Sequence, residues 1–500
     1  MSSPLLRSAY ALSLCWPALI YAQPPAESRS PEVIQQRLNE PQLAVVWSPD
    51  GNRVVCSGQN RAVRQFDRAG KELEPARNGS GGWSVSYALQ GGLVAVCGLD
   101  RSIRLWDPIS GAELRSLDGH LSTAWVAAFL PDGQRLVSAG EDGTIRIWGA
   151  RDGTEIGQVT GHSGPIWCMA LSRDGRLIAT GGSDGAVRIW DLATGRLRRI
   201  CEGNHSGGVW PVVFSPDGRT IASAGWQDGK LFLWETSTGK LRRQIPHPTG
   251  IKCVAFTPEG NCLVTGGNDS VIRFWDLLAG KELSPLEGHR GVVNGISISP
   301  NGALLASASA DNTFRLWDIS RRKTIAVSLT LPARQIEACW AELRRDGGIG
   351  AYDAAGMLAS CPDQTLALLE QRLRATPQPN LPQIIQLIEA TNHKNYAKRE
   401  RASVELVRLG EAAESELTRA IHQSNTLETR IRAERALEKV QGAPLTGEAL
   451  QHIRSVEVLE RIATPQARVL LERLAAGSPH ARLTGEAAAS LKRLDTLAGR

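Results

Sequence analysis

The sequence has little of what marks a nucleic-acid-binding protein or a membrane protein. Its 57 Lys and Arg residues stand against 51 Asp and Glu, so the formal charge of +6 is small for 500 residues. It contains no dense Lys/Arg run, and nucleic-acid binding is therefore not indicated. There is no GxxxxGK[ST] loop for nucleotides, and beyond the first residues no segment is long and apolar enough to span a membrane.

Metal-binding patterns are also lacking. The nine cysteines include no CxxC pair, and no His/Cys cluster has the spacing of a zinc site, so neither a metal nor a cofactor is predicted. Eight cysteines remain beyond Cys15, an even number that permits disulfides in an exported chain. Most lie in apolar strand patterns, which favours free thiols acting as small hydrophobic side chains.

The first residues predict export. Arg7 is followed by an apolar stretch from Ala9 to Ala22, and Gln23 opens a polar, Pro-rich segment. We therefore expect a signal peptide at 1–22, a linker at 23–40 and a periplasmic or secreted protein. An uncleaved anchor or a misplaced start are the alternatives.

Phe and Tyr are scarce, with 7 and 5 residues, whereas Trp occurs 14 times. An internal repeat explains much of this excess. Seven similar units of about 42 residues each carry an aromatic residue followed in most by Asp, separated from the next by 40 to 44 residues. The seven positions are Phe66, Trp106, Trp148, Trp190, Trp234, Trp275 and Trp317.

Each unit predicts four short strands, because alternating apolar segments are separated by Pro-Asp-Gly-type and Asp-Gly-type turns. Four strands per unit are typical of a propeller blade, and blades must stack into a ring to bury both faces. These units resemble the WD40 repeat family over residues 41–330. The resemblance implies an all-β seven-bladed WD40 β-propeller.

WD40 blades commonly link a His, a Ser or Thr, an Asp and the Trp by hydrogen bonds, and five units hold these residues at matching spacing. In the fifth unit the match needs a one-residue insertion at Trp226 or Gln227. Such sets resemble hydrolase triads, but their recurrence in five units favours a structural role. The resemblance places these tetrads at His120, Ser138, Asp142 and Trp148; His162, Thr180, Asp184 and Trp190; His205, Ser223, Asp228 and Trp234; His247, Thr265, Asp269 and Trp275; and His289, Ser307, Asp311 and Trp317.

The first two units lack the His, and Val96 stands at the hydroxyl position of unit two, so we expect these blades to be less rigid. Ring closure is a second departure. Residues 31–40 have a pattern that is more helical than extended, whereas Lys323–Thr330 has the pattern of a final outer strand. We therefore expect the last blade to be completed from its own side, without a strand from the N-terminus.

In the family, a contact position at the start of each innermost strand lies on the upper face. Four consecutive units place Trp there, and exposed Trp is typical of binding sites. Inward packing as core is the alternative, and exposed indoles suit a peptide or a sugar. The predicted partner-binding residues are Trp83, Trp125, Trp167, Trp210, the inserted Trp226, Lys252 and Asn294.

After Pro332 the apolar period becomes helical, with a break at Gly410 and a Pro-rich hinge at 377–379. Pairs of short helices here resemble HEAT-like repeats, as in a bacterial class of exported WD40 proteins. We expect a helical linker region at 331–390 and an all-α HEAT-like domain at 391–500.

These features predict an exported, non-enzymatic scaffold that binds a protein or peptide on the propeller, with the helical tail as a second interaction surface. A carbohydrate-binding propeller is one alternative. A propeller hydrolase or lyase is another, although no site that breaks the repeat symmetry gathers the titratable groups an enzyme needs.

Overall fold

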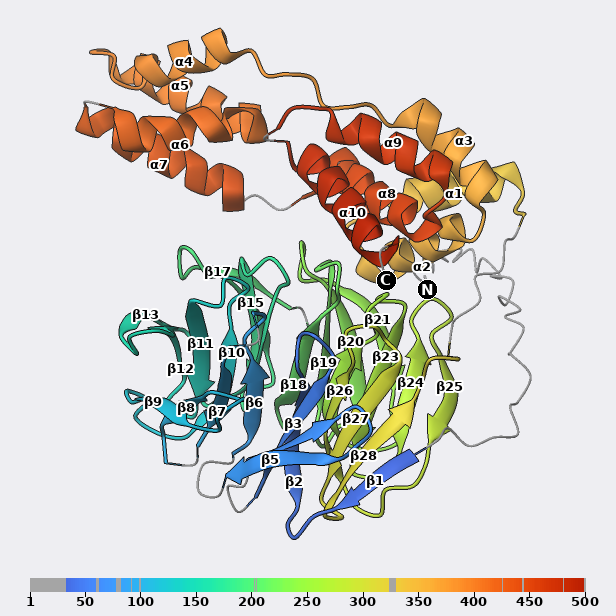
Figure 1. Ribbon diagram of the computed structural model, residues 1–500. Coiled ribbons are helices and arrows are strands. Elements are labelled where there is room, and N and C mark those ends of the chain that lie inside the picture. Colours follow the sequence, from blue (N-terminus) through green and yellow to red (C-terminus); the bar gives the residue numbers. More distant parts are fainter. Residues whose placement is uncertain are drawn as a thin grey trace, which may run out of the picture.

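The structure is a computed structural model, and it describes residues 33–498 apart from 60–62, 78–81, 91, 99, 202, 204, 323–329, 425, 443–444 and 480. The predicted signal peptide lies outside the described residues, as does most of the predicted linker and of the outer strand expected at Lys323–Thr330. Strands fill the first part of the described chain and helices the second (Figure 1).

Seven four-stranded antiparallel sheets form the blades of a β-propeller. Six blades are meanders of four consecutive strands with the first strand innermost, and the innermost strands of neighbouring blades contact one another around the ring. The strands are β1 (Val33–Arg37), β2 (Gln42–Trp47), β3 (Arg53–Gly58), β4 (Val63–Asp67), β5 (Glu72–Arg77), β6 (Ser84–Tyr87), β7 (Val94–Cys97), β8 (Ile103–Trp106), β9 (Glu113–Leu117), β10 (Ala124–Phe129), β11 (Arg135–Gly140), β12 (Thr144–Gly149), β13 (Glu155–Thr160), β14 (Ile166–Leu171), β15 (Leu177–Gly182), β16 (Val187–Asp191), β17 (Leu197–Ile200), β18 (Val209–Phe214), β19 (Thr220–Gly225), β20 (Lys230–Glu235), β21 (Leu241–Pro246), β22 (Ile251–Phe256), β23 (Cys262–Gly267), β24 (Ile272–Asp276), β25 (Lys281–Leu286), β26 (Val293–Ile298), β27 (Leu304–Ser309) and β28 (Thr313–Asp318).

The ring closes differently from the sequence-based expectation. Blade 7 consists of β26, β27, β28 and, as its outermost strand, β1, which pairs antiparallel with β28 from Val33↔Trp317 to Arg37↔Thr313. The helical prediction for residues 31–40 was therefore wrong for β1, and so was closure of the last blade from its own side. The free edge of β28 offers hydrogen bonds that override a weak local helical preference.

Seven apolar clusters hold the blades together, one between each pair of neighbours. The cluster between blades 1 and 2 is the smallest. Its buried members are Val55, Val94, Val96 and Trp106, beside a cavity of about 20 Å³. The described cysteines, from Cys56 to Cys361, are all free and buried.

The described chain continues with helices that form two bodies. The first packs α1 to α3 against α8 to α10 around a shared core, and the second, α4 to α7, is inserted between them with its own core. The division predicted at residue 390 does not separate these bodies, because the sequence does not show which apolar stripes meet. The helices are α1 (Ala333–Glu342), α2 (Gly348–Ala359), α3 (Pro362–Arg372), α4 (Leu381–Ala390), α5 (Tyr396–Leu409), α6 (Glu414–Gln423), α7 (Leu427–Gly442), α8 (Gly447–Ile462), α9 (Pro465–Ala475) and α10 (Arg482–Ala498).

The Pro-rich segment 373–380 is not helical, as the hinge prediction requires, and it joins the two bodies. Gly410 also ends a helix as expected. Its φ of +59° is a left-handed conformation that glycine adopts without strain, and a single 3-10 turn follows before α6. Among the described helices, none combines the length and the apolar character needed to cross a membrane.

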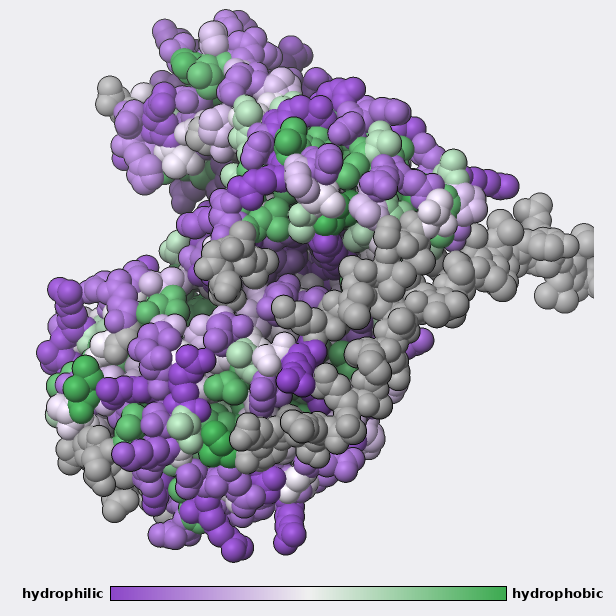
Figure 2. Space-filling model, turned by 45° about the vertical axis from the view of Figure 1, so that its right-hand side comes forward, coloured by the Kyte–Doolittle hydropathy of each residue, from purple (hydrophilic) through white to green (hydrophobic). Residues whose placement is uncertain are grey.

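The first helical body docks on one end of blade 5 (Figure 1). Figure 2 shows mostly hydrophilic side chains on the visible surface near the junction between the propeller and the helices. Helix α2 contacts β21, and α8 and α10 reach the turn between β18 and β19. The second body touches blade 4 through Arg196, which pairs with Glu438 at 2.7 Å.

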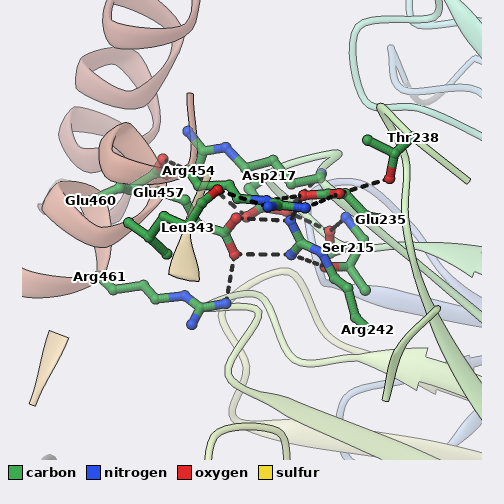
Figure 3. A network of polar contacts seen from close by, with 12 residues as sticks. Ser215, Asp217, Glu235, Thr238, Arg242, Leu343, Arg454, Glu457, Glu460 and Arg461 are labelled. Atoms are coloured by element: carbon green, nitrogen blue, oxygen red, sulfur yellow. Dashed lines mark hydrogen bonds and ion pairs between the residues drawn. The ribbon is translucent and has the colours of Figure 1, made fainter. Parts of the chain in front are cut away.

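A buried network of ion pairs fastens the first body to blade 5, and we call it the clamp (Figure 3). Arg242 of β21 lies 2.8 Å from Glu457 of α8, and Glu235 of β20 lies 2.7 Å from Arg454 of α8. All four side chains are only 3–4% exposed. The clamp holds because each buried charge has a partner of opposite sign, which offsets the cost of removing it from water.

Further contacts extend the clamp. Arg219, from the turn before β19, lies 2.7 Å from Glu460 of α8 and 2.7 Å from Glu486 of α10. Burial tends to lower the pKa of Arg219, but the surrounding carboxylates outweigh it and raise that pKa. Tyr352 of α2 is covered by the guanidinium groups of Arg242, Arg243 and Arg461, at 5.0–5.4 Å from its ring centre.

Candidate partner-binding site

Three predicted tetrads are complete. In blade 3, Trp148 Nε1 donates to Ser138 Oγ at 2.8 Å, His120 Nε2 lies 2.8 Å from the same oxygen, and His120 Nδ1 lies 3.0 Å from Asp142. Blade 7 repeats this with Ser307, and blade 5 with Ser223, eleven residues before its Trp as the insertion predicts. Burial lowers the pKa of these histidines, so the neutral ring accepts from the hydroxyl and donates to the carboxylate.

The prediction for Asp269 in blade 6 was wrong. Trp275 and His247 share Thr265 as expected, but His247 Nδ1 donates to the carbonyl of Thr249 at 2.8 Å. Asp269 pairs instead with Arg273, at 2.5 Å.

Blade 5 has Phe232 where the other four blades have an Arg four positions after the Asp, so no such Arg competes with His205 for Asp228. In the four blades that have this Arg, the residue two positions after the Asp distinguishes the two arrangements. In blades 3 and 7 it is Thr144 or Thr313, whose hydroxyl donates to the Asp and orients it toward the His. Blade 6 has Val271 there and blade 4 has Ala186. In blade 4 Arg188 accordingly pairs with Asp184 at 2.6 Å, and Asp184 lies 3.4 Å from His162.

These tetrads form no accessible catalytic site. The hydroxyl residues of all five tetrads are 0% exposed, so a substrate cannot reach them. They stiffen the blades, because in all five the Trp and the His share one buried hydroxyl.

Blade 2 shows the consequence of losing the hydroxyl. Val96 pairs with Arg104 across β7 and β8, and Trp106 Nε1 is buried with no hydrogen-bond partner among the described residues. Asp100 pairs with Arg104 instead of a His. In blade 1, Phe66 fills the Trp position, is fully buried and stacks on Phe314, whereas Asn60 lies outside the described residues. The expectation that blades 1 and 2 are less rigid stays a prediction.

A bulge places the predicted partner-binding residues. In six blades the register of the innermost strand shifts immediately after its first residue, and in blades 3 to 7 the bulge contains a predicted residue. Bulges re-aim side chains out of the regular alternation of a strand. They therefore give Trp125, Trp167, Trp210, Lys252 and Asn294 equivalent orientations, and Trp83 lies directly before β6 in blade 2.

Five indoles come together at this end of the propeller, and we call them the Trp cluster: Trp83, Trp125, Trp167, Trp210 and Trp226. Trp210 is central, with ring centres 5.9–6.2 Å from those of the other four. Trp83 and Trp125 are 5.4 Å apart. All five side chains are half-buried, so each combines packing against its neighbours with an exposed part.

Lys252 belongs to the same surface. Its ammonium lies 4.5 Å from the ring centre of Trp210 and 4.1 Å from that of Trp226. Desolvation lowers the pKa of this lysine. Asn294 is set slightly apart, because its amide donates to the carbonyl of Gln42 at 2.9 Å.

The Trp cluster and the clamp lie at opposite ends of the propeller. In blade 5, Trp210 is at the start of β18, whereas Arg219 follows the turn after β18 ends at Phe214. Six strand residues separate the two ends by roughly 20 Å. The helical domain therefore leaves the Trp cluster uncovered.

Comparison with known proteins agrees with this architecture. Six segments match the WD domain, G-beta repeat, namely residues 79–107, 111–149, 153–191, 195–235, 239–276 and 280–318. Each segment after the first pairs the outermost strand of one blade with three strands of the next, which interlocks neighbouring blades. The chain therefore carries WD40 repeats within a seven-bladed propeller. No curated protein matches the chain.

Sequence reasoning identified the Trp positions but missed the residues of the clamp. Arg219 and Arg242 have counterparts in blade 4, Arg176 and Arg198, and Glu235 replaces the usual Asp. Arg454, Glu457 and Glu460 lie on one helix. Only their pairing in three dimensions distinguishes them from ordinary solvated charges.

Proposed function

We propose that the chain is an exported, non-enzymatic scaffold that binds a protein or peptide partner at the Trp cluster. One observation carries this proposal: four partly exposed indoles at equivalent positions, together with Trp226, gather on the propeller end that the helical domain leaves free. Half-exposed Trp is the side chain most typical of protein-binding hot spots.

The geometry favours a peptide over a neutral sugar. Sugars stack on flat, open indole faces, whereas these rings pack against one another at 27–80° and Lys252 covers Trp210 and Trp226. A peptide side chain fits between tilted rings more readily than a pyranose lies on them.

The second body of helices supports a further interaction surface. Helices α4 and α5 border an open groove, and exposed apolar side chains lie on both. These are Leu381 and Ile385 on α4, and Tyr396 and Val404 on α5.

The test is capture of partners from an extract of exported proteins, comparing the natural chain with Trp125→Ala/Trp167→Ala/Trp210→Ala. We expect the variant to lose those partners that bind the natural chain, while circular dichroism shows that it is folded. The matched control is Ile109→Ala/Ile156→Ala/Leu197→Ala, which removes exposed apolar groups elsewhere on the propeller. Retention of all partners by the Trp variant would refute the proposal.

Export has its own test. The full chain, expressed in a bacterial cell, is expected in the periplasmic or secreted fraction, with a mature N-terminus at Gln23. A cytoplasmic chain that retains residues 1–22 would contradict this part of the proposal.

A further inference from the structure

Lys252 presents a charge that the fold does not neutralise. Its side chain is half-buried, and among the described residues no carboxylate or other hydrogen-bond acceptor contacts its ammonium. The faces of Trp210 and Trp226 stabilise the charge but leave its N–H donors without acceptors. A half-buried cation without an anion is costly to keep, which is a reason to look for a ligand.

The same lysine restricts what the cluster can bind. An aromatic cage that recognises an external cation needs open ring faces. Here the ammonium of Lys252 already lies over two of the five rings, at 4.1 and 4.5 Å. A second cation would meet both occupied faces and a like charge, so a basic ligand is disfavoured.

Two indoles add unmatched donors. The Nε1 atoms of Trp83 and Trp125 are buried and have no hydrogen-bond partner within the part of the chain that the structure describes. Both rings lie against Trp210 at steep angles of 80° and 67°. Asn294 already uses its amide donor on Gln42. Among the seven predicted residues, the groups that lack a hydrogen-bond partner are therefore N–H donors, namely the ammonium of Lys252 and the two indole N–H groups, and they surround an apolar surface.

We propose that the Trp cluster binds an acidic peptide, with a carboxylate of the peptide on Lys252 and an adjacent apolar side chain among the indoles. The inference rests on the proposed function and specifies its partner. The carboxylate supplies the acceptors and the negative charge that the site lacks, and the apolar side chain packs against the tilted rings. An aspartate or glutamate side chain and a free C-terminus offer the same chemistry.

A display experiment tests this on the full-length protein. The probe is a random-peptide library, displayed once with free C-termini and once internally. It is selected in parallel on the natural chain, Lys252→Met, the control Lys281→Met and Trp125→Ala/Trp167→Ala/Trp210→Ala. Lys281 is exposed at the start of the outer strand of blade 6, away from the cluster. Thermal unfolding verifies that each variant is folded.

We expect the natural chain and Lys281→Met to enrich peptides that place Asp, Glu or a terminal carboxylate beside an apolar residue. Lys252→Met should lose the acidic preference, and selected peptides should bind it about tenfold or more weakly. Replacing the peptide carboxylate by its amide should weaken binding to the natural chain by a similar factor, and should hardly affect binding to Lys252→Met. Enrichment confined to the free-C-terminus library identifies the terminal carboxylate as the ligand.

Two results would overturn the inference while leaving the proposed function intact. One is enrichment of neutral or basic peptides that depends on the Trp residues, and the other is an acidic preference that Lys252→Met retains. A different failure, in which the Trp variant enriches the same peptides as the natural chain, would remove the proposed function itself. Binding of alginate, a carboxylate-bearing polysaccharide, without enrichment of any peptide would replace the peptide by an acidic sugar polymer.

Discussion

At the scale of single residues, the blades differ in whether their buried donors and acceptors are matched. The Trp indole of blade 3 donates to a hydroxyl, whereas the indole of Trp106 in blade 2 has no acceptor in the described ranges of the chain. An unmatched buried N–H costs about 1–3 kcal/mol. Blade 2 therefore retains a correctable defect beside the smallest of the inter-blade clusters.

The substitution Val96→Thr should correct it. The new hydroxyl takes the place that Ser138 holds in blade 3, and we expect the free energy of unfolding to rise by about 0.5–1 kcal/mol. The control is Val264→Thr in blade 6, which buries a hydroxyl in the apolar cluster between blades 6 and 7 and should cost about 1–2 kcal/mol. Urea unfolding of the two variants measures this. Equal losses would show that Trp106 does not use the hydroxyl.

The two kinds of Asp in the tetrads should also respond differently. Asp142 accepts from His120, Thr144 and the backbone N–H of Leu121, so Asp142→Asn should destabilise the protein by about 2 kcal/mol. Asp269 makes no hydrogen bond to its His, and its partner Arg273 keeps a second carboxylate in Glu282 at 3.0 Å, so Asp269→Asn should cost about 1 kcal/mol, less than Asp142→Asn. The difference between the two midpoints of thermal unfolding is the measurement. A larger loss for Asp269→Asn would contradict the assignment.

The sequence predicts the residues of the tetrads well, because a regular spacing of chemically specific groups repeats in five units. It does not predict which Asp faces its His. In the blades with an Arg four positions after the Asp, that choice depends on whether the residue two positions after the Asp is a Thr or an apolar residue, as Thr144 and Val271 show. Blade 5 has Phe232 in place of the Arg, and Asp228 faces its His without a Thr. The direction of the Trp side chains was likewise open, because a bulge and not the plain alternation of the strand sets it.

At the scale of elements, closure of the ring depends on β1. This strand covers the edge of β28, and Ile34 packs against the cluster between blades 7 and 1. The sequence alone predicted the opposite, because a strand of five residues in which two β-branched residues are followed by Gln-Gln-Arg gives little strand signal until its partner is known.

Removal of residues 1–38 should therefore open the propeller. We expect a large loss of thermal stability and association through the exposed edge of β28, detected by unfolding and by light scattering. Removal of residues 1–22 alone is the control and should leave the unfolding midpoint unchanged. If the shorter and the longer truncations behaved alike, β1 would not be the closing strand.

At the scale of the whole molecule, the clamp joins two folds that the repeats alone would leave independent. Arg242→Met removes one cationic partner from each of the buried carboxylates Glu457 and Glu235. The free energy of unfolding should therefore fall by about 3–5 kcal/mol. The double variant Arg242→Met/Glu457→Leu should recover part of this loss, because it removes both charges. Denaturant unfolding with propeller and helix signals measured separately is the test, and we expect the single variant to separate the two transitions. Coincident transitions in Arg242→Met would contradict a clamping role.

The free energy of unfolding of the protein should decrease in acid, over a defined range of pH. Burial and the neighbouring Arg188 lower the pKa of His162 from 6.5 to about 4. Between these two pH values the histidine is protonated in the unfolded chain but stays neutral in the native chain. The free energy of unfolding therefore falls as the pH drops from 6.5 toward 4, by at most about 3 kcal/mol. The arginines around Glu457 also lower its pKa, so protonation of that group adds a further loss below pH 4.5. Urea midpoints measured across this range for the natural chain and His162→Gln should show a shallower slope for the variant, and an identical slope would exclude His162.

The placement of the clamp and the Trp cluster at opposite ends gives the molecule a polarity. The chain's own helices cover one end of the propeller, so only the other end can bind a partner. Each molecule therefore presents a single Trp cluster. A partner held there and another held on α4 and α5 would face away from each other across a body braced by buried charges. Such a molecule would act as a rigid spacer that sets the distance and the angle between two bound partners, which do not contact each other.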